Sequence, residues 1–199
     1  MKRWRISKYN PEFRDERGRY IKDEWTEYCE IGQEFEAGVF KKEDYFNVEN
    51  QLVEAVLLLL EELNIKQLQC VDLWCPPKLT EPIYYMEGNE KIIIDENPAK
   101  LFEEVYLEKK RKYPECYTEQ INEIYYNIED GQFVDITMVK NLLPLLFRGH
   151  IESKLIHIPK LMLGFPGRMY IWVHTEKEFF SEKLINKILD LNLYVEVYP

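Results

Sequence analysis

The sequence predicts an α+β fold with a mixed or antiparallel sheet and helices mainly on one face. Two observations carry this prediction. Long segments place apolar residues at helical spacing, and short segments after Gly149 alternate apolar and polar residues between turn signals. With 199 residues and 46% hydrophobic content, the chain predicts one compact domain over residues 1–199, with residues 1–40 packed on its body.

In the N-terminal half of the chain, residues 4–9 are expected to form a strand. The turn signal Asn10-Pro11 ends this strand. Residues 43–63 carry a wide apolar stripe that predicts the central buried helix. Apolar and polar residues alternate over residues 66–74, which predicts a strand that ends before Pro76-Pro77. Residues 83–86 and 92–94 are two short strand candidates.

In the middle of the chain, Asn97 and Pro98 are typical of a helix start. This helix is expected to turn four apolar side chains inward and to end in the basic run 109–112, where cations suit the helix dipole. A short helix follows Thr118, and an apolar helix over 137–146 is expected to be bent or closed by Pro144. The four inward side chains are Leu101, Phe102, Val105 and Tyr106.

The C-terminal half reads as three strands, a helix and a strand. The strands cover residues 151–158, 160–165 and 168–174, and a capping box of Thr175 with Glu178 opens a helix through Leu191. Residues 193–198 form the last strand. If the strand at 66–74 joins the same sheet, the order approaches a split βαβ arrangement that is ferredoxin-like in the C-terminal half.

Charge is divided unevenly along the chain. The first 25 residues hold eight Lys or Arg against five Asp or Glu, whereas the other 174 hold 18 against 31. Because opposite fields attract, the basic N-terminal segment is expected to lie against the acidic body or a partner. Arg14, Arg17 and Arg19 form either a solvated loop or an anion-binding edge. The net charge of −10 argues against nucleic acid as a partner.

One face of the predicted sheet is a candidate binding surface. Because side chains alternate across a strand, the strands at 168–174 and 193–198 would present a set of aromatic residues and one arginine together. Tyr, Trp and Arg dominate binding hot spots, but the N-terminal half could instead cover this face as a second core layer. The set is Arg168, Tyr170, Trp172, Tyr194 and Tyr198.

Catalytic signatures are sparse. The chain has no Gly-rich phosphate loop and no G-x-S-x-G, so we expect no cofactor. Cys70 and Cys75 are separated by four residues, and neither Cys29 nor Cys116 has a near neighbour, which favours reduced thiols over a metal site. Asp135 with Glu152-Ser153-Lys154 resembles the Asp then Glu-x-Lys pattern of restriction-endonuclease-like nucleases. That resemblance implies two carboxylates that hold Mg²⁺ and a lysine that assists a water.

A second resemblance lies at the start of the chain. The segment W-x-I-x-K-Y-N-P over residues 4–11, with D-E-W-T at residues 23–26, resembles the N-terminus of small uncharacterised bacterial proteins. The resemblance implies a bacterial, cytoplasmic protein and no particular chemistry. No apolar run approaches the roughly 20 residues of a membrane span, and no secretory signal is evident, so a membrane partner is not expected.

Three functional hypotheses follow. The first is a non-catalytic protein-binding protein, an immunity-type inhibitor that neutralises a basic toxin through acidic and aromatic surface. The second is a Mg²⁺-dependent nuclease or hydrolase that uses Asp135, Glu152 and Lys154. The third is a self-associating structural protein, with the face around Tyr170 and Trp172 forming a homodimer.

Overall fold

A seven-stranded sheet organises the computed structural model, which describes all residues except 1, 88–89, 96, 167–168, 176–179 and 198–199. Every neighbouring pair of strands in this sheet is antiparallel. The predicted α+β class is therefore confirmed. From one edge to the other the strands are β11 (Tyr194–Val197), β1 (Lys2–Ser7), β10 (Tyr170–Thr175), β9 (Leu161–Gly164), β8 (Glu152–His157), β4 (Gln67–Trp74) and β7 (Phe133–Asp135).

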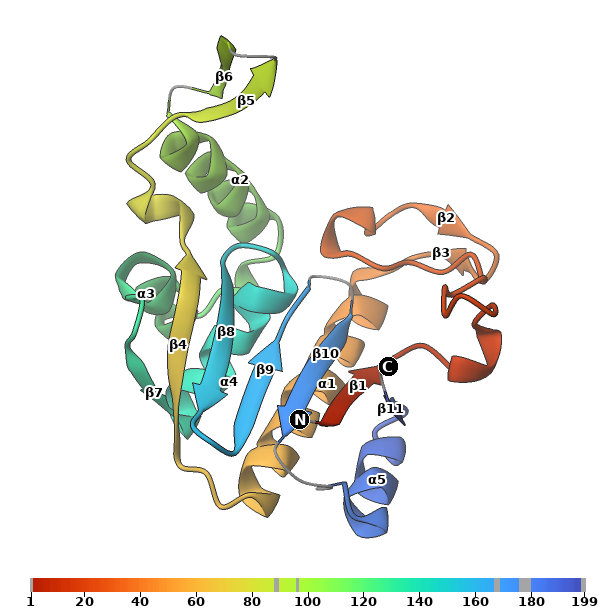
Figure 1. Ribbon diagram of the computed structural model, residues 1–199. Helices are drawn as coiled ribbons and strands as arrows, with labels where there is room; N and C mark the ends of the chain where they lie inside the picture. Colours follow the sequence, from red (N-terminus) through yellow and green to blue (C-terminus); the bar gives the residue numbers. More distant parts are fainter. Residues whose placement is uncertain (1, 88–89, 96, 167–168, 176–179, 198–199) are drawn as a thin grey trace.

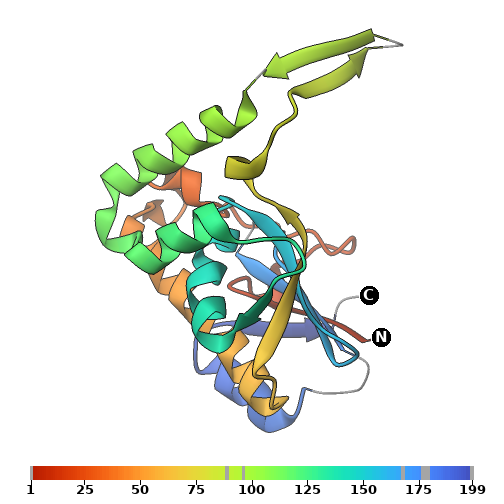
Figure 2. The same ribbon diagram turned by 90° about the vertical axis from the view of Figure 1, so that its left-hand side faces the viewer.

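Helices pack against one face of the sheet, as Figures 1 and 2 show. They are α1 (Lys42–Glu62), α3 (Glu119–Asn127), α4 (Ile136–Phe147) and α5 (Glu182–Leu189). Apolar residues of α1 and α4 meet the inward side chains of the strands, such as Ile6, Leu155 and Ile171, all fully buried. None of the helices formed by the described residues combines the length and apolar composition needed to cross a bilayer.

The order of the strands differs from the ferredoxin-like order considered for the C-terminal half. Strand β1 lies between β10 and β11, so the last two strands do not pair with each other. Two interactions tie β1 and the segment after it to this position. Arg5 and Arg14 both form ion pairs with Glu196 of β11, at 3.3 and 2.8 Å. The basic N-terminal segment thus lies against a carboxylate of the body.

Helix α2 (Pro98–Lys112) begins as predicted, because the Asn97 side chain accepts a hydrogen bond from the Lys100 backbone. Its predicted inward face is only partly right: Tyr106 is fully buried, but Leu101 and Val105 are exposed. The reason is that α2 runs along the edge of the body, which covers only a narrow strip of the helix. Similarly, Pro144 does not close α4, which continues to Phe147.

The start of α5 corrects another prediction. Thr175 is the last residue of β10, and the side chain of Ser181 caps the helix by accepting a hydrogen bond from the Leu184 backbone. Glu178 lies outside the described residues. The helix ends at Leu189, two residues before the predicted Leu191, and Asn192 beyond it adopts a left-handed conformation with φ of 57°.

Because Ser181 satisfies one of the free amides of α5, replacing it with alanine should lower the free energy of unfolding by about 1 kcal/mol. Ser181→Asp should retain most of that stability, since aspartate is an equally good cap. Urea denaturation of the three proteins measures the difference. Equal stability of Ser181→Ala and the native chain would contradict this assignment of the cap.

Two hairpins lie outside the main sheet. The shorter one pairs β2 (Glu34–Phe35) with β3 (Gly38–Val39), and the longer one pairs β5 (Ile83–Glu87) with β6 (Glu90–Asp95). The β5–β6 hairpin, hereafter the arm, extends away from the body in both views (Figures 1 and 2). Its two strands were predicted from sequence, but their position outside the body was not.

Candidate functional site

The predicted aromatic set lies partly on the helix-free face of the sheet. Tyr170 and Tyr194 flank Ser7 of β1, and Trp172 pairs with Arg5 in the next row. All three aromatic side chains are half-buried. Arg168 and Tyr198 lie outside the described residues. The structure therefore places Tyr170, Trp172 and Tyr194 on one face and leaves their role in binding as a hypothesis.

The N-terminal segment covers one end of this face. The Arg5 guanidinium lies 5.3 Å from the centroid of the Tyr170 ring, and the rings of Tyr9 and Tyr20 pack against each other at 4.7 Å. Further along the face, Trp172 packs across Gly164, where an added Cβ would come within 3.6 Å of the indole. At least part of the aromatic surface is thus in contact with the N-terminal segment.

The nuclease hypothesis has no site in this arrangement. Asp135 pairs with Gln67 at one end of β4, whereas Glu152 pairs with Trp74 at the other end. Seven residues of strand correspond to roughly 20 Å, so the two carboxylates cannot share an ion.

Two of the three side chains named by this hypothesis, Asp135 and Lys154, have other partners. Asp135 caps α4 through the Met138 backbone at 2.8 Å, and Lys154 forms an ion pair with Asp72. Among the described residues, no group of three or more His, Cys, Asp or Glu side chains could hold a metal ion.

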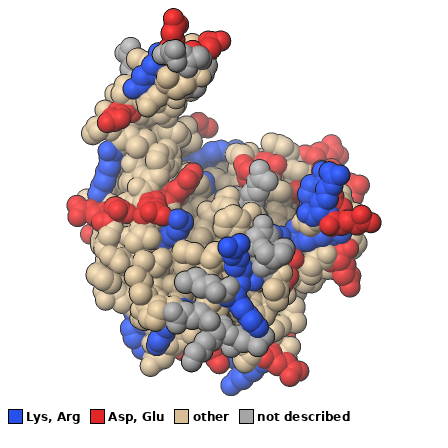
Figure 3. All heavy atoms as spheres, in the orientation of Figure 1, with Lys and Arg blue, Asp and Glu red and all other residues tan. Residues whose placement is uncertain are grey.

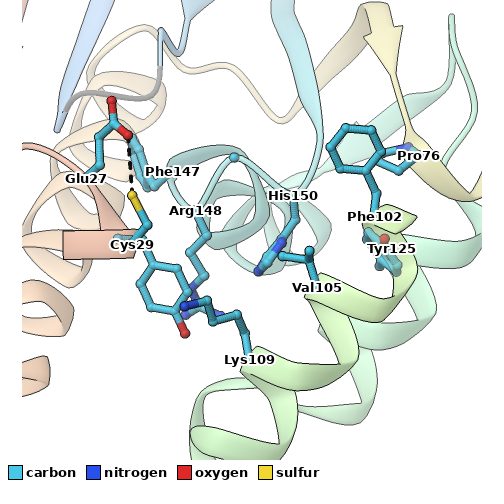
Figure 4. A pocket seen from close by; sticks show the side chains of 12 residues that line it. Glu27, Cys29, Pro76, Phe102, Val105, Lys109, Tyr125, Phe147, Arg148 and His150 are labelled. Atoms are coloured by element: carbon cyan, nitrogen blue, oxygen red, sulfur yellow. Dashed lines mark hydrogen bonds between the residues drawn. The ribbon is translucent and has the colours of Figure 1, made fainter. Parts of the chain in front are cut away.

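A pocket of about 310 Å³ lies between α2 and the body, and Figure 4 shows the side chains that line it. Phe102, Val105 and Lys109 of α2 form one wall. The opposite wall contains Cys29, from the 3₁₀ turn Tyr28–Glu30, and His150, which follows the end of α4. The Lys109 ammonium lies 5.5 Å from the centroid of the Tyr28 ring.

Two titratable groups of this pocket are held in their neutral forms. Burial lowers the pKa of His150 to about 3, with Arg148 and Lys109 adding to the effect, and its Nε2 lies 2.7 Å from the Tyr117 hydroxyl. Burial, followed by the charge of Glu27, raises the pKa of the Cys29 thiol, which donates to that carboxylate. An activated cysteine needs the opposite shift of its thiol pKa.

A buried ion pair fixes the floor of the same region. The Arg148 guanidinium donates to both oxygens of Glu49, through Nε at 2.8 Å and Nη2 at 2.5 Å. Its remaining Nη1 donates to the carbonyl of Cys116 at 2.7 Å. Both charged side chains are only 3% exposed, so the pair connects α1 with the end of α4 inside the core.

The arm presents a different kind of surface. Tyr84 pairs directly with Ile93 across the hairpin, and Met86 pairs with Lys91, whose ammonium lies 3.6 Å from the Tyr84 ring centroid. These four residues therefore share one face of the hairpin. Four large apolar side chains of the arm are strongly exposed: Tyr84 by 44%, Met86 by 57%, Ile93 by 50% and Ile94 by 64%.

Acidic residues accompany this apolar surface. Residues 81–97 contain five Asp or Glu and one Lys. In Figure 3 the arm projects at the top, with red carboxylates near its tip and uncharged side chains between them. The sequence predicted the strands but gave no signal of their exposure, because an isoleucine run reads equally well as a buried strand.

Comparisons of the chain with protein-family models, with curated proteins and with solved structures found no match in any of the three.

Proposed function

We propose that this chain is a non-catalytic, cytoplasmic bacterial protein that binds another protein through its arm, and that the partner is a basic toxin which it neutralises. The observation that carries the proposal is the arm itself, which holds four large apolar side chains away from the body in an acidic setting. This assigns the binding role to the arm ahead of the sheet face around Trp172.

The energetics of the hairpin favour a partner. An isolated two-stranded hairpin is marginally stable in water, and the described residues of the arm pack mainly on one another. A surface that exposes tyrosine, methionine and isoleucine together is typical of protein interfaces. A partner that covers the face of Tyr84, Met86 and Ile93 would both bury this area and order the hairpin.

Charge selects the kind of partner. The arm with its flanking residues, 81–97, carries five carboxylates and one lysine, so it attracts a basic surface and repels an acidic one. Complementary charge accelerates encounter, while buried aromatic and aliphatic side chains slow release. An inhibitor of a basic toxin needs both properties, because it must bind quickly and stay bound.

Replacing Tyr84 and Ile93 together with alanine should weaken partner binding by about thirtyfold or more, the loss expected when a hot spot of about 2 kcal/mol is removed. Binding is measured by capture from native lysate, identification of the bound protein and titration of that purified protein. The matched control is Ile21→Ala/Val197→Ala, which removes two apolar side chains of the body that are 65% and 63% exposed. The control should bind like the native chain.

Three outcomes would contradict the proposal. One is a captured protein that is acidic, and another is equal binding by the arm variant and its control. The third is a native chain that sediments as a dimer while the arm variant sediments as a monomer. That result would assign the arm to a second copy of this chain and would favour the self-associating alternative.

A further inference from the structure

The pocket between α2 and the body has one apolar end and one charged end, and the proposed role of the arm makes no use of it. Four side chains form the apolar end: Phe102, Val105, Pro76 and Tyr125. The Lys109 ammonium marks the other end, and Figure 4 shows it well separated from Phe102 and Pro76. A molecule that matches both ends has an apolar body and a charged group.

The spacing of residues along α2 sets the length of such a molecule. Phe102, Val105 and Lys109 lie at positions i, i+3 and i+7, so they share one face of the helix. With a rise of 1.5 Å per residue, Phe102 and Lys109 are separated by about 10 Å along the helix axis. A medium-length acyl chain, or a phenyl ring on a short linker, covers this distance when it ends in a charged group.

The Lys109 ammonium can pair with an anion. Among the described residues it forms no ion pair, and it lies 5.5 Å from the centroid of the Tyr28 ring. The neighbouring Arg148 is already engaged, because its guanidinium donates to Glu49 and to the carbonyl of Cys116. Lys109 is half-buried, so a carboxylate beside it would form a charge-assisted hydrogen bond that is partly shielded from water.

The local charge around Lys109 favours an anion over a cation. Burial, followed by the charges of Arg148 and Lys109, lowers the pKa of His150, which indicates a positive potential at this end of the pocket. One carboxylate, Glu27, also lines the pocket. Figure 4 shows it away from Lys109 and beside Cys29, whose thiol donates to it. The anion site is therefore confined to the Lys109 end.

The apolar end is formed before any ligand arrives. The Tyr125 ring stacks on the Tyr106 ring with centroids 3.8 Å apart, and Phe102 packs edge-on against Trp74 at 5.0 Å. Val105 lines the pocket and is nevertheless 43% exposed. An apolar ligand would remove this exposed surface from water, and the fixed walls reduce the entropy lost on binding.

We infer that this pocket binds a small carboxylate with an apolar body, such as a medium-chain fatty acid or an aryl alkanoate. The carboxylate pairs with Lys109, and the apolar body packs against Phe102 and Val105. The volume of about 310 Å³ lies at the lower end of the range for pockets that hold small molecules. The site is separate from the arm, so either proposal can fail without the other.

Four probes test the pocket with the full chain: octanoate, 3-phenylpropanoate, 3-phenylpropanamide and 3-phenylpropylamine. Calorimetry should give saturable binding of both carboxylates with a Kd at or below about 5 mM, the affinity expected for ligands of this size. The amide should bind about tenfold more weakly than its carboxylate, because it has no charge to pair with an ammonium, and the amine should bind more weakly still. In ¹H–¹⁵N spectra the largest shifts should occur at Val105, Lys109 and His150.

Variants of α2 locate the binding. Lys109→Gln should weaken binding of 3-phenylpropanoate about tenfold and leave binding of the amide unchanged, so the preference for the carboxylate disappears. Val105→Trp places an indole in the apolar end and should weaken binding of both carboxylates at least tenfold. Lys112→Gln and Leu107→Trp make the same changes at exposed positions of α2 that do not line the pocket, so they should bind like the native chain.

The arm variant Tyr84→Ala/Ile93→Ala should also bind both carboxylates like the native chain, which separates this site from the surface proposed for the protein partner. The inference is wrong if neither carboxylate shows saturable binding, or if the amide or the amine binds as tightly as 3-phenylpropanoate. It is equally wrong if Lys109→Gln behaves like Lys112→Gln, or if the arm variant loses the binding.

Discussion

Replacing Arg148 with methionine should lower the free energy of unfolding by about 3–5 kcal/mol, the usual cost of leaving one member of a buried ion pair behind. Arg148 donates to both oxygens of Glu49 and to the carbonyl of Cys116, and it lies 4.9 Å from the centroid of the Tyr117 ring. A methionine fills part of the volume but satisfies none of these acceptors. The Glu49 carboxylate would remain buried at 2% residue exposure.

The variant should also acquire a characteristic pH dependence. Burial raises the pKa of Glu49, and Arg148 opposes that effect in the native chain. Without Arg148 the carboxyl must bind a proton in the folded state, so its folded pKa exceeds its unfolded value. Stability of Arg148→Met should then fall as the pH rises above the unfolded value, a trend that simple loss of packing does not produce.

Chemical denaturation of four proteins separates these effects. Glu49→Leu/Arg148→Met should recover most of the loss, because replacing both charges with apolar groups avoids the unpaired carboxylate. Arg111→Met, at an exposed position near the end of α2, should change stability by less than about 0.5 kcal/mol. If Arg148→Met proved as stable as Arg111→Met, the ion pair would have no structural importance.

Mild acid should destabilise the protein through His150. Its pKa is lowered from 6.5 to about 3 by burial, so the folded state holds a neutral imidazole while the unfolded state binds a proton. Between these two values the unfolded state binds more protons, and stability falls as the pH falls. The contribution of this residue alone amounts to about 2 kcal/mol lost between neutral pH and pH 5.

Denaturation curves at pH 7 and pH 5 measure this contribution. His150→Gln keeps a polar partner for the Tyr117 hydroxyl but cannot titrate, so it should start less stable at pH 7 and lose less on acidification. His174→Gln, on the helix-free face of the sheet, should retain most of the native acid sensitivity. An unchanged pH dependence in His150→Gln would show that the imidazole is not the main cause.

Local sequence patterns predicted the helices and strands more reliably than they predicted which side chains of these elements are buried. The apolar stripe over residues 43–63 corresponds to α1, since a wide stripe can only be satisfied inside a core. Asn97 and Thr118 cap α2 and α3, because a cap depends only on the side chain and the next few amides. The capping box at Thr175 was wrong because the pattern is short and pairing of Thr175 with β1 and β9 overrides it.

The candidate sites depend on contacts between distant residues, which patterns do not encode. Glu49 and Arg148 are 99 residues apart, and Tyr117 and His150 are 33 apart. The exposure of the arm could not be predicted from the sequence either, because residues 92–94 have the composition of a buried strand. Charge asymmetry did signal one contact between distant residues, because Arg5 and Arg14 of the basic N-terminal segment pair with Glu196 of β11.

The position of β1 sets the order of events during synthesis. Among the described residues, the strand partners of residues 2–7 are residues 170–175 and 194–197, so this strand must wait for about 165 further residues before it finds a neighbouring strand. At ribosomal rates of about 5–20 residues per second, that wait lasts roughly 8–33 s. Throughout this interval the strand has no partner strand, and Trp4 and Ile6 lack the neighbours that bury them in the folded protein.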